Sequence, residues 1–176
     1  MSLNLLLIVV AAVMVLCIVS GYNKGAVKEI ISMISLLITS IVVILLANGV
    51  SSYIDGKVIN VILVVLLLTV IGIVRHLLGV VFFSAELIAK LPIVSWLDKV
   101  LGVVVGIIET ILLLWTIYTF VMLMDMGAIG QIILEYTQDS KILTWLFEQN
   151  YLASLVEQLG AKIDSLQLTQ YIQQLQ

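Results

Sequence analysis

The chain has 176 residues, of which 62% are hydrophobic and 11% are charged. Soluble domains carry roughly 25% charged residues, so this composition argues against a water-soluble catalytic domain. The net charge of −3 provides no basic surface of the kind that nucleic acid requires. The single cysteine, Cys17, excludes an internal disulfide and a cysteine metal cluster.

Four apolar runs are each long enough to cross a hydrocarbon layer of about 30 Å as a helix. In chain order, they predict spans over residues 3–19, 27–47, 58–83 and 96–124. The first run has no basic residue before it and no good cleavage site after it, which favours a retained span over a signal peptide. Turn-forming residues at 20–25 predict a short antiparallel connection between the first two spans.

Two further helices are predicted outside the spans. Residues 84–91 combine a serine cap, an early acid and a late base, and Pro92 follows, a pattern typical of a short interfacial helix. In the tail over 126–176, apolar residues between 152 and 166 recur at helical spacing with charged residues between them, which predicts an amphipathic helix. Its apolar face could pack on the outer membrane surface, on the end of the bundle, or on the same helix of another subunit.

The predicted fold is therefore an all-α membrane protein. It has a four-helix transmembrane domain over residues 1–125, an interfacial helix between the third and fourth spans, and the amphipathic tail. The first and third connections carry five basic residues, namely Lys24, Lys28, Arg75, Lys90 and Lys99, whereas the second carries only Lys57. Because basic residues collect in cytoplasmic loops, this difference predicts that both termini are extracytoplasmic.

In lipid, small and polar residues mark the faces on which helices meet, because the hydrophobic effect does not drive their association. Three spans carry such a face at helical spacing, and we interpret each as a packing face. These faces are Lys28, Ser32, Ser35 and Thr39 on the second span, Thr69, Gly72, His76 and Gly79 on the third, and Gly102, Gly106, Glu109 and Thr110 on the fourth.

Glu109 is the most informative polar residue, because an ionisable side chain deep in a span costs about 2.5 to 3.5 kcal/mol on insertion scales. It could form a structural ion pair, or be protonated and hydrogen-bonded to a serine or threonine. Alternatively, Arg75, His76 and Glu109 could form a proton or ion path. Hydrolase, zinc and phosphate-loop motifs are missing from the sequence, so we expect neither a cofactor nor enzymatic activity.

Two segments resemble the colicin V production proteins of bacteria, the CvpA family. The first runs from Gly21 to Glu29 and contains Lys24, Gly25 and Lys28; the second runs from Trp96 to Gly106 and contains Asp98, Lys99 and Gly102. The resemblance covers roughly residues 1–124. One departure is Glu109-Thr110, where the family often has a basic residue and a glycine.

The resemblance implies a small multi-pass protein of the bacterial cytoplasmic membrane, associated with bacteriocin production or export and with envelope homeostasis. We expect a non-enzymatic accessory protein that acts by helix–helix association, with a second copy or with an export or envelope protein. Lysines 24, 28 and 99 would meet anionic lipid headgroups at the cytoplasmic face. The alternative is an oligomeric channel or transporter in which Glu109 and the Arg75-His76 pair line an ion or proton path.

Overall fold

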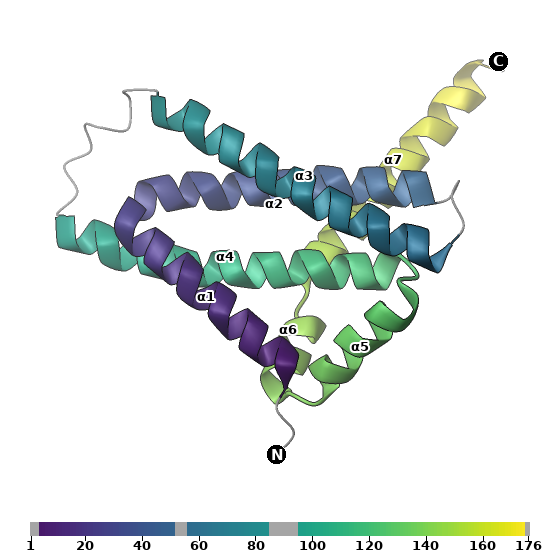
Figure 1. Ribbon diagram of the computed structural model, residues 1–176. Helices are drawn as coiled ribbons and strands as arrows, with labels where there is room; N and C mark the ends of the chain where they lie inside the picture. The colour runs from purple at the N-terminus through teal and green to yellow at the C-terminus, as the bar shows by residue number, and fades with distance from the viewer. Residues whose placement is uncertain (1–3, 52–55, 85–94, 175–176) are drawn as a thin grey trace.

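A computed structural model describes residues 4–51, 56–84 and 95–174, which form seven helices (Figure 1). Four of these helices are long and apolar enough to cross a membrane, which confirms the predicted class of fold. The seven helices are α1 (Leu5–Lys24), α2 (Ala26–Ser51), α3 (Lys57–Ser84), α4 (Ser95–Leu123), α5 (Gly127–Gln138), α6 (Lys141–Glu148) and α7 (Tyr151–Gln174). Apart from Ser84, the predicted interfacial helix lies outside the described residues.

The connection between α1 and α2 is a single residue, Gly25, with a φ of 81°. The predicted turn over residues 20–25 was therefore too long, because α1 continues through Lys24. A glycine adopts this left-handed conformation without a steric cost, so one residue is enough to reverse the chain. Gly21 is helical and permits a close helix contact instead of a turn.

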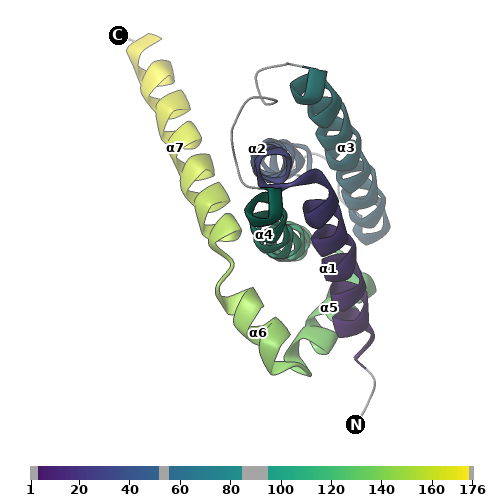
Figure 2. The ribbon, with the colours of Figure 1, turned by 90° about the vertical axis from the view of Figure 1, so that its left-hand side faces the viewer.

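Helix α4 is the centre of the bundle: α1, α2, α6 and α7 all contact it, whereas α3 packs mainly on α2. Figure 2 looks down α2 and α4, with α7 on one side and α1 and α3 on the other. The main core includes Leu36 and Ile44 of α2 and Phe120 of α4, which are almost fully buried. From α3, this core receives Val64 and Ile71.

Helices α5 and α6 occupy the space between α1 and α4. Helices α1 and α4 meet near the start of α2 and diverge toward the N-terminus of α1, and α5 and α6 lie between them there (Figures 1 and 2). A second core joins the four helices, with Tyr118 and Leu143 fully buried and Leu6 and Val10 packed against them. Residues that follow the fourth span are thus packed into the bundle.

Helix α7 begins on the bundle and then leaves it (Figure 2). Leu152 and Val156 are buried in the main core, and the bundle itself covers this part of the predicted apolar face. The rest of that face is not covered in the same way: Leu155 is 40% exposed, Ile163 43% and Leu166 56%. The sequence pattern marked a wider apolar stripe than the bundle buries.

Candidate functional site at the turn between α1 and α2

The two segments that carry the family resemblance meet at one end of the bundle, although more than 60 residues separate them in the sequence. Their contact is made by Gly21 of α1 and Gly102 of α4: a Cβ atom added to either would overlap the other's backbone carbonyl. One turn further along, a Cβ on Gly106 would lie 2.5 Å from the carbonyl oxygen of Cys17. The two backbones can approach this closely only because these positions lack side chains.

Asp98 joins the start of α4 to the start of α2. Its Oδ1 accepts a hydrogen bond of 2.9 Å from the backbone N–H of Ala26. Its carboxylate fills the space beside Gly25 that a Cβ on that glycine would need. The first N–H groups of a helix need acceptors, and a carboxylate there also interacts favourably with the helix dipole. Asp98 therefore caps α2 from another helix.

The charges at this end are arranged with anions inside and cations outside. Glu29 has no exposed side-chain surface, and its Oε2 lies 3.4 Å from Nζ of Lys24, which is 40% exposed. This contact is electrostatic and lacks the alignment of a hydrogen bond. The ammonium of Lys99 lies 5.1 Å from the centre of the Tyr22 ring, within the range of a cation–π interaction.

We call this cluster the turn site; it consists of Gly21, Lys24, Gly25, Lys28, Glu29, Asp98 and Lys99. Its lysines are exposed, including Lys28, whereas its glycines and Glu29 are buried. The result is a rigid base that presents a basic outer surface. Such a surface can bind anionic groups.

The polar residues predicted on the second span line buried contacts with α4. Ser32 Oγ donates a 3.3 Å hydrogen bond to Oε1 of Glu109, which has no exposed surface. About two helical turns further along the same contact, Thr116 Oγ1 donates to Ser40 Oγ at 3.1 Å. Ser35 and Thr39 are also buried, whereas Lys28 is at the exposed end. The structure thus places Glu109 in a helix–helix contact and gives it a serine partner.

The face predicted on the third span differs from the one that packs. Thr69, Gly72 and His76 are exposed, and a Cβ on Gly72 would meet open space. The inward side of α3 instead carries Asn60, Val64 and Ile71. Within the single chain, α3 therefore packs mainly through branched apolar side chains, and the predicted small and polar face is left uncovered at Thr69, Gly72 and His76.

The predicted path of Arg75, His76 and Glu109 is not assembled in the described residues. His76 is exposed on α3, whereas Glu109 is buried where α4 meets α2. The side chain of Arg75 and the surroundings of Gly79 lie outside the described part of the chain. Within that part, no group of three or more His, Cys, Asp or Glu side chains is placed to hold a metal ion.

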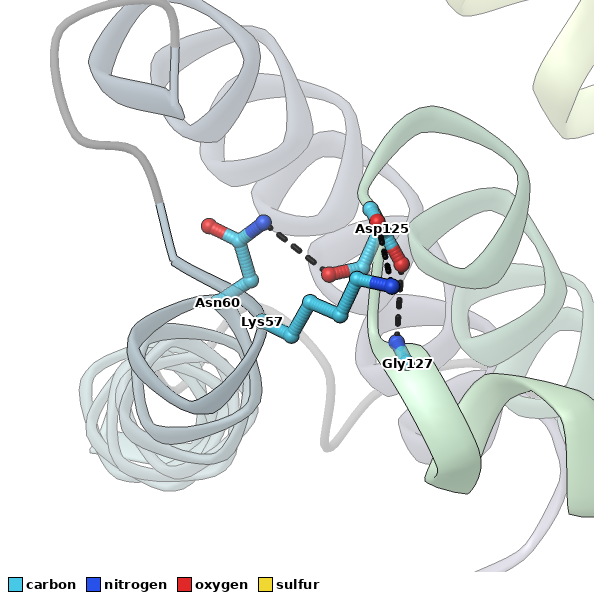
Figure 3. A network of polar contacts seen from close by, with 4 residues as sticks. All are labelled: Lys57, Asn60, Asp125 and Gly127. Carbon is cyan, nitrogen blue, oxygen red and sulfur yellow. Dashed lines mark hydrogen bonds and ion pairs between the residues drawn. The ribbon is translucent and has the colours of Figure 1, made fainter.

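A second polar cluster, which was not predicted from the sequence, closes the opposite end of the bundle (Figure 3). Asn60 Nδ2 donates to the backbone carbonyl of Asp125 at 3.0 Å, and Lys57 Nζ lies 3.7 Å from Asp125 Oδ2. Oδ1 of Asp125 accepts a 2.9 Å hydrogen bond from the Gly127 N–H. The available signal was the pair of opposite charges, Lys57 and Asp125, which both flank spans at the same end.

Three polar contacts attach α5, α6 and α7 to α4, and these were not predicted from the sequence either. The Tyr118 hydroxyl lies 3.0 Å from the Thr137 hydroxyl. Trp115 Nε1 donates to the carbonyl of Leu146 at 2.8 Å. Asn150 caps α7 through the Ala153 N–H and donates to Thr119 Oγ1 of α4 at 3.2 Å.

A model of the family described as Colicin V production protein matches residues 7–150. The match extends beyond the resemblance expected over residues 1–124: it takes in α5 and α6 and ends just before α7. It also covers the whole turn site. Searches of curated proteins and of solved structures gave no significant match.

Proposed function

Because the chain belongs to the colicin V production protein family, we propose that it is a non-enzymatic accessory protein of the bacterial cytoplasmic membrane. It acts in bacteriocin production or export, or in envelope homeostasis. Its mode of action is helix–helix association with a second copy or with an export or envelope protein. The observation that carries the proposal is the turn site.

The turn site has the properties of a docking surface. Its base is held by the contact between Gly21 and Gly102 and by the hydrogen bond from Ala26 to Asp98. A surface that is already ordered loses little conformational entropy when a partner binds. The exposed Lys24, Lys28 and Lys99 favour an acidic partner segment and anionic headgroups around it.

The distribution of charge supports a cytoplasmic turn site with both termini on the extracytoplasmic side. The turn between α1 and α2 and the start of α4 lie at one end of the bundle, and the end of α2, the start of α3 and the end of α4 lie at the other (Figure 1). The turn end carries the lysines of the turn site. At the other end, Lys57 is paired with Asp125. A basic excess at one end is typical of the cytoplasmic side.

The proposal can be tested by photo-crosslinking in cells. A photoreactive amino acid at Asn23, which is exposed between Tyr22 and Lys24, should form a discrete adduct with a membrane protein or with a second copy. Lys99→Glu should abolish this adduct, because it reverses a charge at the same surface. Lys57→Glu is the matched control, since it reverses an exposed charge at the opposite end.

Two results together would contradict the proposal. One is the lack of any specific adduct at Asn23, and the other is a strictly monomeric purified protein. An adduct that survives Lys99→Glu and Lys57→Glu equally would show that the partner does not recognise the basic charge of the turn site.

A further inference from the structure

Helix α7 crosses two spans at the end of the bundle away from the turn site. Asn150, just before α7, donates to Thr119 Oγ1 of α4 at 3.2 Å. Further along, a Cβ on Gly160 would lie 4.0 Å from the side chain of Leu45 on α2. Because α7 meets α4 first and α2 almost three turns later, it runs across the spans, and its C-terminal part projects past their end (Figures 1 and 2).

The crossing lies at one boundary of the hydrocarbon layer. The hydrogen bond from Ala26 to Asp98 sets a common level for α2 and α4 at the turn site. At 1.5 Å per residue, Thr119 lies about 32 Å along α4 from Asp98. On α2, Leu45 lies about 29 Å from Ala26 by the same measure. Both distances match the roughly 30 Å thickness of a hydrocarbon core. With the charged turn site at one membrane surface, α7 therefore crosses the bundle at the other.

One side of α7 is exposed although it is mostly apolar. We call it the α7 edge; it consists of Tyr151, Leu155, Lys162 and Leu166. At 100° per residue, these four positions fall within about 60° of one another around the helix. Tyr151 is 65% exposed, Leu155 40% and Leu166 56%, and Lys162 is exposed as well. An aromatic ring and a long basic side chain beside leucines are typical of a helix at the membrane interface.

The direction in which the α7 edge faces follows from the handedness of the helix. Figure 2 is seen from the turn end, with α7 running upward from its N-terminus and the bundle on its right. Leu152 and Val156 are buried against the bundle. The α7 edge precedes these two residues by about 90° around a right-handed helix, so it faces the viewer and thus the bilayer. The exposed Glu157 lies about 150° from the edge, on the outward side.

The charge on the α7 edge favours lipid over a second copy as its partner. In a seam between two α7 helices that uses Leu155 and Leu166, the heptad spacing would put Lys162 at a core position, which costs stability. At a membrane surface, the stem of Lys162 can lie along the apolar edge while its ammonium reaches the headgroups. We infer that the α7 edge is a lipid-binding surface, which anchors α7 in the interfacial region of the leaflet away from the turn site.

The test uses the full-length protein with Cys17→Ser in nanodiscs of phosphatidylcholine, with one new cysteine that carries a small fluorophore. The labelled positions are Leu155 and Leu166 on the edge and Glu157 as the matched control, all of them exposed. Phosphatidylcholine brominated near the top of its acyl chains should quench the fluorophore at Leu155→Cys and Leu166→Cys several-fold more than at Glu157→Cys. Iodide in the buffer should quench the three in the opposite order. Circular dichroism checks that each labelled variant is folded.

Two outcomes would overturn the inference. In the first, iodide quenches all three positions equally and the brominated lipid quenches none, which would place the α7 edge in water. In the second, Leu155 and Leu166 are shielded from both quenchers and unlabelled Leu166→Cys forms a disulfide-linked dimer, which would assign the edge to a second copy. Neither outcome involves the turn site, so the proposed function would be left standing.

Discussion

From the close contact between α1 and α4, we predict that Gly102→Ala destabilises the bundle. A Cβ at this position would overlap the carbonyl of Gly21 and lie 3.1 Å from the backbone carbon of Gly25. Backbone atoms have no rotamer by which to move aside, so the two helices must separate. At the looser neighbouring contact, moving a Cβ on Gly106 from 2.5 Å to an ordinary 3.4 Å requires a shift of about 0.9 Å. Gly102→Ala requires a larger one.

The free-energy cost follows from this overlap. Forcing one extra carbon into a packed interface typically costs 1 to 3 kcal/mol, and we expect Gly102→Ala near the upper end, at about 3 kcal/mol, because the contact is backbone to backbone. The matched control is Gly72→Ala, where the Cβ meets open space. Both substitutions gain the same helix propensity, about 0.5 to 1 kcal/mol, so their difference isolates the packing cost.

The measurement is reversible unfolding of the two variants in mixed micelles of mild detergent and sodium dodecyl sulfate, followed by circular dichroism. Gly102→Ala should unfold at a clearly lower fraction of the denaturing detergent than the wild-type protein, and Gly72→Ala at an equal or higher fraction. If the two variants unfold together, the close contact of α1 with α4 does not stabilise the bundle, and the reasoning is refuted.

Three further predictions follow from the polar contacts. Asp98→Ala should lower the free energy of unfolding by about 1 kcal/mol because it removes the cap of Ala26, whereas Asp98→Asn keeps an acceptor and should cost less. In a variant whose single cysteine is replaced by serine, a membrane-impermeant maleimide should label Gln138→Cys in intact cells but label Asn23→Cys only after permeabilisation; the reverse pattern would invert the topology. Glu109→Gln should leave ion and proton flux in liposomes as low as in the wild-type protein, since its side chain is buried between helices; a flux that depends on Glu109 would restore the channel hypothesis.

The spans could be predicted from the sequence because the free energy of transferring apolar side chains to hydrocarbon adds up over 18 or more residues. No single residue therefore decides whether a segment spans the membrane. The polar face of α2 could be anticipated for a related reason: few groups in a span can hydrogen-bond, and Ser32, Ser35 and Thr39 repeat at helical spacing. The partner of each face could not be predicted. Gly21 looked like a turn residue, although it is helical and contacts Gly102.

Other features depend on shape instead of residue type. The packing side of α3 is made by Val64 and Ile71, and apolar side chains of this size also cover its outer side, so composition does not distinguish the two. The inward side is set by which side chains interdigitate with α2, and this is known only when both helices are placed. For the same reason, Gly72 was predicted to lie on a packing face, although it is exposed in the single chain.

The placement of α5 and α6 follows from the glycine contact. Two inclined helices that touch near one end must diverge toward the other, and the contact of Gly21 with Gly102 lies close to the turn. The resulting gap exposes Leu114 and Tyr118 of α4 unless another segment covers them. The segment from Gly127 to Glu148 has the apolar side chains to do so, and Trp115 and Thr119 of α4 hydrogen-bond to Leu146 and Asn150, at and just beyond its C-terminal end. Glycines at one end of the bundle thus determine the space that α6 fills at the other.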